Sequence, residues 1–78
     1  MSASEKCYVK VDRDDGSRTY KGPWVHSHCK READAWRLSF RDYRVQIIAA
    51  SDARADVKLW ARATRDGGRY YPEPVPAQ

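Results

Sequence analysis

Both histidines and one of the two cysteines lie in a single short stretch, from His26 to Cys29. Together with Cys7, they provide four nitrogen and sulfur ligands of the types that bind tetrahedral zinc. A bound zinc ion can compensate for the small core of a short chain. The order of the four residues matches no usual zinc-finger spacing, so we expect no metal site. The zinc alternative, if it holds, uses Cys7, His26, His28 and Cys29.

The same two cysteines allow two further interpretations. A disulfide between Cys7 and Cys29 would stabilise a small domain, but such bonds are rare in the cytoplasm. The other interpretation is that both are ordinary core thiols, which is the commoner role of a free cysteine. We favour core cysteines and surface histidines over the disulfide and the zinc site.

Catalysis by a cysteine needs a histidine within hydrogen-bonding distance and a third group to orient that histidine. His28 and Cys29 are neighbours in the chain, and neighbours on a helix point about 100° apart. The glycine pair Gly67-Gly68 follows an expected helix, whereas phosphate-binding loops precede one. We therefore predict that the protein is not an enzyme and uses no cofactor.

Length and charge narrow the class of protein. The chain has 78 residues, enough for one small domain, and carries a formal charge of +4. A basic protein suits a polyanionic partner, although here each part of the chain carries both acidic and basic residues and none forms a basic block. No stretch approaches the roughly 20 apolar residues of a membrane span, and none resembles a signal peptide. We expect a cytoplasmic protein without membrane contact.

The elements that must position these residues begin with a hairpin. Residues 7–12 alternate between apolar and polar side chains, and 18–24 can return as a second strand. Asp15-Gly16 between them is a typical two-residue turn, because such turns need positive φ. This turn predicts that Val11 lies opposite Tyr20 and Cys7 opposite Trp24.

A helix is expected after the hairpin, with Ser27 as its N-cap. Its apolar stripe is Cys29, Ala33, Trp36 and Phe40. Residues 43–49 form a third strand, with Tyr43, Val45 and Ile47 pointing inward. A second helix follows, capped by Ser51 and ending at Gly67-Gly68. Its apolar stripe is Ala53, Val57, Trp60, Ala61 and Thr64.

These elements predict an α+β fold, in which a small antiparallel three-stranded sheet carries two helices on one face (ββαβα). We expect a flexible N-terminus at 1–6, a single domain at 7–68 and an extended or disordered tail at 69–78. Three prolines at alternate positions in the tail favour polyproline-like chain.

In this layout the other sheet face is bare and carries basic, aromatic and polar residues. Such a face can stack bases and bind phosphates. We therefore predict binding to DNA or RNA by a small accessory protein of the kind found in phages and plasmids. The competing interpretation is the ordinary polar outer face of a small antiparallel sheet. The predicted nucleic-acid-binding residues are Tyr8, Lys10, Lys21, Arg44 and Gln46, with Thr19 beside them.

Three large apolar residues fall outside the predicted core: Leu38, Ile48 and Leu59. An exposed apolar patch marks a protein interface. The alternative function is therefore an adaptor or inhibitor that binds a protein partner or forms a homodimer through this patch. A helix phase shifted by one residue would bury the same side chains and remove the patch.

Overall fold

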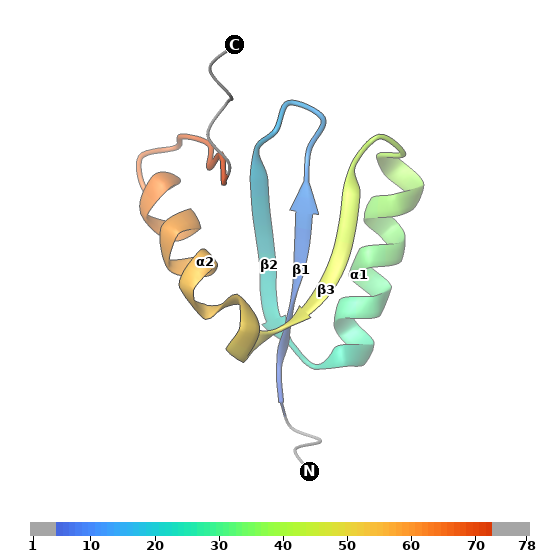
Figure 1. Cartoon of the computed structure of the whole chain (residues 1–78). Coiled ribbons are helices and arrows are strands. Elements are labelled where there is room, and N and C mark those ends of the chain that lie inside the picture. The colour runs from blue at the N-terminus through green and yellow to red at the C-terminus, as the bar shows by residue number, and fades with distance from the viewer. Residues whose placement is uncertain (1–4, 73–78) are drawn as a thin grey trace.

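The computed structural model describes residues 5–72 and contains three strands and two helices (Figure 1). They follow one another as β1 (Cys7–Asp12), β2 (Arg18–Trp24), α1 (His26–Ser39), β3 (Arg44–Ala49) and α2 (Ala50–Ala63). The strands form one antiparallel sheet in the order β2-β1-β3. The predicted α+β fold and the element order ββαβα are confirmed.

The hairpin register differs from the predicted one over most of its length. Val11 pairs with Thr19, and Tyr20 pairs with Lys10. The predicted pair of Cys7 with Trp24 is present, because an irregularity between Cys7 and Val9 restores the register there.

The loop at the tip of the hairpin explains this shift. The strands are joined by residues 13–17, closed by a hydrogen bond from the Arg13 amide to the Ser17 carbonyl at 2.8 Å. Asp15 Oδ1 also accepts hydrogen bonds from the Ser17 amide and hydroxyl, at 2.8 and 2.6 Å. A five-residue loop thus replaces the predicted two-residue turn, and Tyr20 moves to the opposite face of the sheet.

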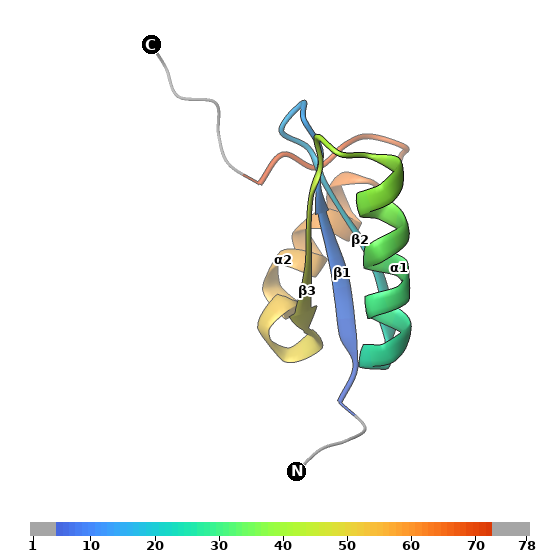
Figure 2. The ribbon, with the colours of Figure 1, turned by 90° about the vertical axis from the view of Figure 1, so that its right-hand side faces the viewer.

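The helices lie on opposite faces of the sheet, which corrects the prediction that they share one. Figure 2 shows the sheet nearly edge-on between α1 and α2. With the observed register, each face has its own packing residues. Val9, Val11 and Val45 face α1, whereas Tyr20 turns its ring toward Trp60 of α2.

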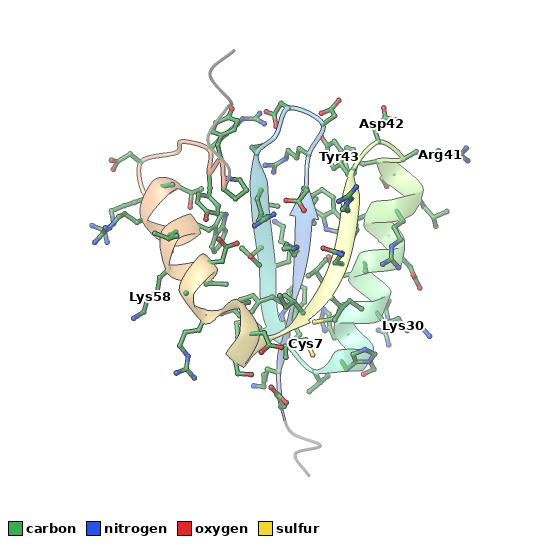
Figure 3. The ribbon with its side chains drawn as sticks, in the orientation of Figure 1. Cys7, Lys30, Arg41, Asp42, Tyr43 and Lys58 are labelled. Carbon is green, nitrogen blue, oxygen red and sulfur yellow. The ribbon has the colours of Figure 1, made fainter. Side chains whose placement is uncertain are left out.

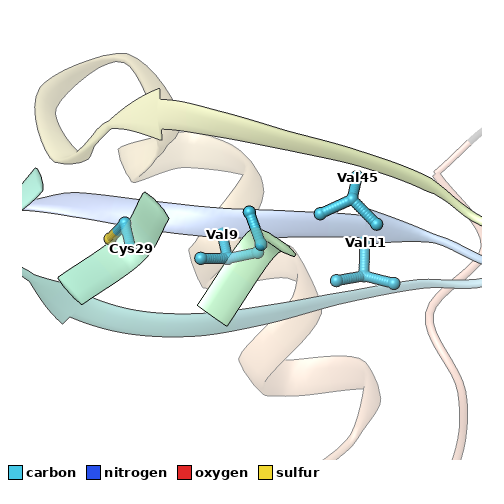
Figure 4. Packing of buried hydrophobic residues seen from close by; sticks show 5 residues of the cluster. Val9, Val11, Cys29 and Val45 are labelled. Atoms are coloured by element: carbon cyan, nitrogen blue, oxygen red, sulfur yellow. The ribbon is translucent and has the colours of Figure 1, made fainter. Parts of the chain in front are cut away.

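The α1 side holds the apolar core. Five buried residues pack together there: Val9, Val11, Cys29, Ala33 and Val45 (Figure 4). The predicted stripe of α1 is confirmed at Cys29, Ala33 and Trp36, and the predicted inward residues Tyr43, Val45 and Ile47 also belong to or pack against this cluster. Phe40 lies at the end of α1 and is exposed.

The helix starts differ from the predicted caps. α1 begins after Val25 and α2 after Ala49, and neither N-cap residue donates or accepts a side-chain capping bond. Ser27 and Ser51 therefore lie inside the first turns. α2 follows β3 without a loop. At its start, the Ala50 amide donates a hydrogen bond to the Lys6 carbonyl at 2.9 Å.

The segment after α2 returns to the sheet. The Arg18 amide donates to the Tyr70 carbonyl at 2.7 Å, and Tyr70 is buried. Part of the predicted tail at 69–78 thus lies against β2. Residues 1–4 of the predicted N-terminus and 73–78 of the tail are outside the described residues. Within 5–72, neither helix combines the length and apolar character needed to cross a bilayer.

Candidate nucleic-acid interface

Four of the predicted nucleic-acid-binding residues share the sheet face on which α2 lies. Lys10 pairs with Gln46 across β1 and β3, and Tyr8 pairs with Ile48 one step away on the same face. Arg44 pairs with Asp12. Side chains of directly opposed residues are neighbours, so these residues form one surface. Arg44 and Gln46 are exposed, while Tyr8 and Lys10 are half-buried.

This sheet face is less suited to bind phosphates than its sequence indicates. Asp12, next to Arg44, places a carboxylate on the same surface. The ring of Tyr8 packs edge-on against Tyr20 at a centroid distance of 5.7 Å. Arg18 on this face is ion-paired with Asp12, so the face offers two further cations, Lys10 and Arg44, and part of its aromatic surface is used in packing.

Lys21 does not belong to this surface. It pairs with Val9, whose side chain faces α1. Its Nζ lies 5.8 Å from the centroid of the Trp36 ring on α1. Thr19 pairs with core residue Val11 and is buried. The one-residue change of register moves both residues across the sheet.

The three apolar residues of the alternative interface do not form one patch. Leu38 on α1 is 80% exposed and Leu59 on α2 is 52% exposed. The two helices lie on opposite faces of the sheet, so these side chains are far from one another. Ile48 is half-buried on β3. A partner cannot contact all three through one flat surface.

The proposed zinc ligands do not converge. Among residues 5–72, no three His, Cys, Asp or Glu side chains are grouped to hold a metal ion. The His28 ring stacks on Trp24 at 4.3 Å, and Cys29 Sγ donates to the Cys7 carbonyl at 3.2 Å. Both cysteines are free thiols. Burial raises the pKa of Cys29, which keeps its thiol protonated at neutral pH.

Sequence reasoning missed a row of basic residues on α2. Arg54, Lys58 and Arg62 recur every four residues, and Arg65 continues the row in the turn after the helix. We call these four residues the α2 basic row. All four are exposed, and none has an ion-pair partner within residues 5–72. Figure 3 shows Lys58 extending from α2 away from the sheet.

The apolar residues beside the row widen this surface. A shallow hollow of ≈ 550 Å³ is lined by Lys58, Arg62, Arg65, Ala55, Leu59 and Ala61. No carboxylate lines it. The i, i+4, i+8 spacing of the basic residues was visible in the sequence and could have identified the row.

The outward side of α1 has a different charge pattern. Glu32 and Asp34 lie among its basic residues. Arg37 donates to Asp34 at 3.4 Å and to the Val45 carbonyl at 2.9 Å. Part of the positive charge on α1 is therefore neutralised or used to cover the β3 edge.

A polar cluster holds α2 in its position. Asp56 of α2 accepts hydrogen bonds from the hydroxyls of Tyr20 and Tyr70 and from Arg18 Nη1, the last at 2.9 Å. Arg18 Nε also donates to Asp12 at 2.5 Å. Since Asp56 points inward, the opposite side of α2, with the basic row, is left toward solvent.

The pKa values in this cluster follow from its contacts. Burial alone would raise the pKa of Asp56, but hydrogen bonds from Tyr20, Tyr70 and Arg18 outweigh it and lower the pKa below the ordinary value. Burial, followed by the bond to Asp56, raises the pKa of Tyr70 to about 12. The pKa of Tyr20 is raised for the same reasons. The cluster is thus a carboxylate with neutral phenols at physiological pH.

No protein-family model matches the chain, and no curated protein or solved structure shows significant similarity to it. The function of the chain must therefore be inferred from the geometry and charge of its surfaces.

Proposed function

We propose that this protein is a non-enzymatic module that binds the phosphate backbone of nucleic acid, with the α2 basic row as its principal contact. The observation that carries the proposal is the row itself. It consists of exposed cations on one side of a helix, without carboxylate partners in the described chain.

The dimensions of the row suit a nucleic-acid strand. From Arg54 to Arg62 the helix rises about 12 Å, at 1.5 Å per residue. Phosphates of one strand of a duplex advance 3.4 Å along the axis per nucleotide while winding around it, so a row parallel to the axis covers the axial length of about three to four of them. Lysine and arginine at this spacing can contact several phosphates of one backbone without reading the bases.

Electrostatic binding of this type depends strongly on salt. If all four cations of the row contact phosphates of a DNA duplex, the slope of log K against log salt approaches about −3.6. The test measures binding of the purified chain to labelled duplex DNA, single-stranded DNA and RNA over a salt series. Saturable binding with a negative slope is the expected result.

Matched variants locate the contact. Lys58→Glu/Arg62→Glu reverses two charges of the row, and Lys30→Glu/Arg31→Glu makes the same charge change on α1. Figure 3 shows Lys58 and Lys30 extending from opposite sides of the molecule. We expect the α2 pair to reduce affinity at least tenfold and to flatten the salt slope by about 2, and the α1 pair to act much more weakly.

A third variant, Lys10→Glu/Arg44→Glu, tests the sheet face. Equal losses from the α1 and α2 pairs would mean that net charge, not the row, governs binding. A larger loss of affinity from the sheet pair would show that the sheet face predicted from sequence is the principal contact. Failure to bind any nucleic acid at low salt would disprove the proposed function and leave a protein partner for the hollow around Leu59.

A further inference from the structure

A second basic site lies between the carboxyl-terminal end of α2 and the start of β2. Here the start of β2 and the segment after α2 lie side by side, joined by the bond from Arg18 to Tyr70 (Figure 1). Between them is a hollow of ≈ 220 Å³ whose lining includes three arginines, Arg13, Arg18 and Arg69, together with Trp60 and Thr64. No acidic side chain lines it.

Carboxylates hold two of these arginines without lining the hollow themselves. Arg18 is bound by Asp12 and Asp56, and Arg69 donates to Asp15 at 2.9 Å. An arginine has five N–H donors, and the two bonds of Arg18 to carboxylates use two of them. The carboxylates thus fix the guanidinium groups and leave N–H donors for a ligand.

Arg13 has no ion pair of this kind, although Asp15 lies close enough that hydrogen bonds from Ser17, and then the charges of Arg69 and Arg13, lower the pKa of that carboxyl. Arg13 Nη1 donates to the neutral Ser17 hydroxyl at 3.4 Å, and within residues 5–72 no carboxylate lies in ion-pair range. A half-buried cation beside two oriented guanidinium groups favours an anion with several oxygen acceptors.

We propose that this hollow, the arginine pocket, binds a terminal phosphate group, that is, a phosphomonoester or inorganic phosphate. Its volume is below the roughly 300–1,000 Å³ of pockets for drug-sized ligands, which fits a small anionic group. A monoester has one substituent and enters a pocket end-on, whereas a backbone phosphodiester continues in both directions. The phosphate belongs to a small molecule or to the end of a nucleic-acid strand.

The arginine pocket is independent of the α2 basic row. Trp60 and Thr64 lie on the half-buried side of the helix and its last turn, and the row lies on the exposed side. Either site can therefore fail without the other. The pocket requires the three arginines and makes no use of Lys58 or Arg62.

The test is an NMR titration of the full chain, labelled with nitrogen-15, with sodium phosphate and with ribose 5-phosphate at constant ionic strength. Saturable shifts are expected for the Trp60 indole N–H and the Nε–H groups of the pocket arginines, with smaller changes at Trp24 and Trp36. Arg13→Gln retains a donor for Ser17 and should weaken binding about tenfold or more, the effect of losing one charge-assisted hydrogen bond. Arg41→Gln removes the same charge from an exposed position outside the pocket and is the control.

A second comparison distinguishes the source of the phosphate. One oligonucleotide is used with a 5′-phosphate and with a 5′-hydroxyl. A gain in affinity from the 5′-phosphate that Arg13→Gln abolishes identifies a strand end, and saturable binding of ribose 5-phosphate without that gain identifies a small molecule. Chemical-shift changes that increase linearly with the concentration of each phosphate compound would overturn the proposal. Equal losses of affinity from Arg13→Gln and Arg41→Gln would overturn it as well. Lys58→Glu/Arg62→Glu should leave binding of ribose 5-phosphate unchanged, which separates this result from that of the proposed function.

Discussion

Between the sheet and α1, five buried apolar side chains pack together, whereas between the sheet and α2 a carboxylate joins an arginine and two tyrosines. Of the residues in α2, Ala53 alone is buried, and α1 buries Cys29 and Ala33 beneath Trp36. The α1 side therefore gains stability chiefly from apolar burial, which varies little with pH. The α2 side depends on hydrogen bonds to one charged group.

This difference affects the two helices as candidate binding surfaces. On α2 the inward carboxylate of Asp56 accepts hydrogen bonds from Arg18 and Tyr20 of the sheet and from Tyr70 of the following segment, and the cations of the basic row point outward. On α1 the outward cations share their surface with Glu32 and Asp34. A helix docked by a polar cluster can thus present an uninterrupted basic row.

The largest expected effect tests the α2 side. Asp56→Ala removes the acceptor of three hydrogen bonds and leaves Tyr20 and Tyr70 without their partner. The Asp56 side chain is 27% exposed, so we expect a loss of about 3 kcal/mol at neutral pH, near the lower limit for broken buried pairs. Urea unfolding of both proteins measures this loss.

The loss of unfolding free energy caused by Asp56→Ala should become smaller as the pH falls. The folded-state pKa of Asp56 is below its unfolded value, so its contribution is complete above about pH 4 and falls as the pH drops further. Asp52→Ala, at an exposed position in the first turn of α2, is the control and should cost under about 1 kcal/mol. A constant loss down to pH 2 would show that Asp56 acts by packing.

Val9→Ala tests the α1 side. Val9 is fully buried, and losing two methyl groups while leaving a cavity should cost about 2–3 kcal/mol. Because the core cluster contains no carboxylate, the loss should stay the same between pH 3 and pH 7. A loss that changed with pH like that of Asp56→Ala would remove the distinction between the two sides.

The tyrosines of the α2 side should destabilise the protein at high pH. The pKa of Tyr70 is about 12 in the folded chain, against about 10 for an ordinary tyrosine. Its contribution is complete below pH 10 and is lost as the pH rises toward 12. An ultraviolet titration should show Tyr20 and Tyr70 ionising at a higher pH than an ordinary tyrosine, and Tyr70→Phe should remove one of these late steps.

The smallest effect is expected at Leu38. Its side chain is 80% exposed, so Leu38→Ser should change the free energy of unfolding by less than about 0.5 kcal/mol. If the α1 surface forms a homodimer, the same substitution will shift the sedimentation coefficient toward that of a monomer. An unchanged sedimentation profile over a concentration series would count against a dimer at Leu38.

The sequence by itself determined the type and order of the elements. The alternation in β1 and β3 and the stripe of α1 from Cys29 to Trp36 follow from the sequence, because the periods of strands and helices are local properties of the chain. The basic row of α2 is equally a local pattern, present in the spacing of Arg54, Lys58 and Arg62.

Only the tertiary structure decided the register of β2, the sheet face of each helix and the grouping of the candidate site. The loop bonds of Asp15 and Ser17 shift the register of β2 by one residue, and the irregularity between Cys7 and Val9 restores the predicted pairing at Trp24. That residue sends Tyr20 toward α2 and Lys21 toward α1, since side chains alternate across a strand. Asp56, Arg18 and Tyr70 are far apart in sequence, so no local pattern could show that one carboxylate joins them.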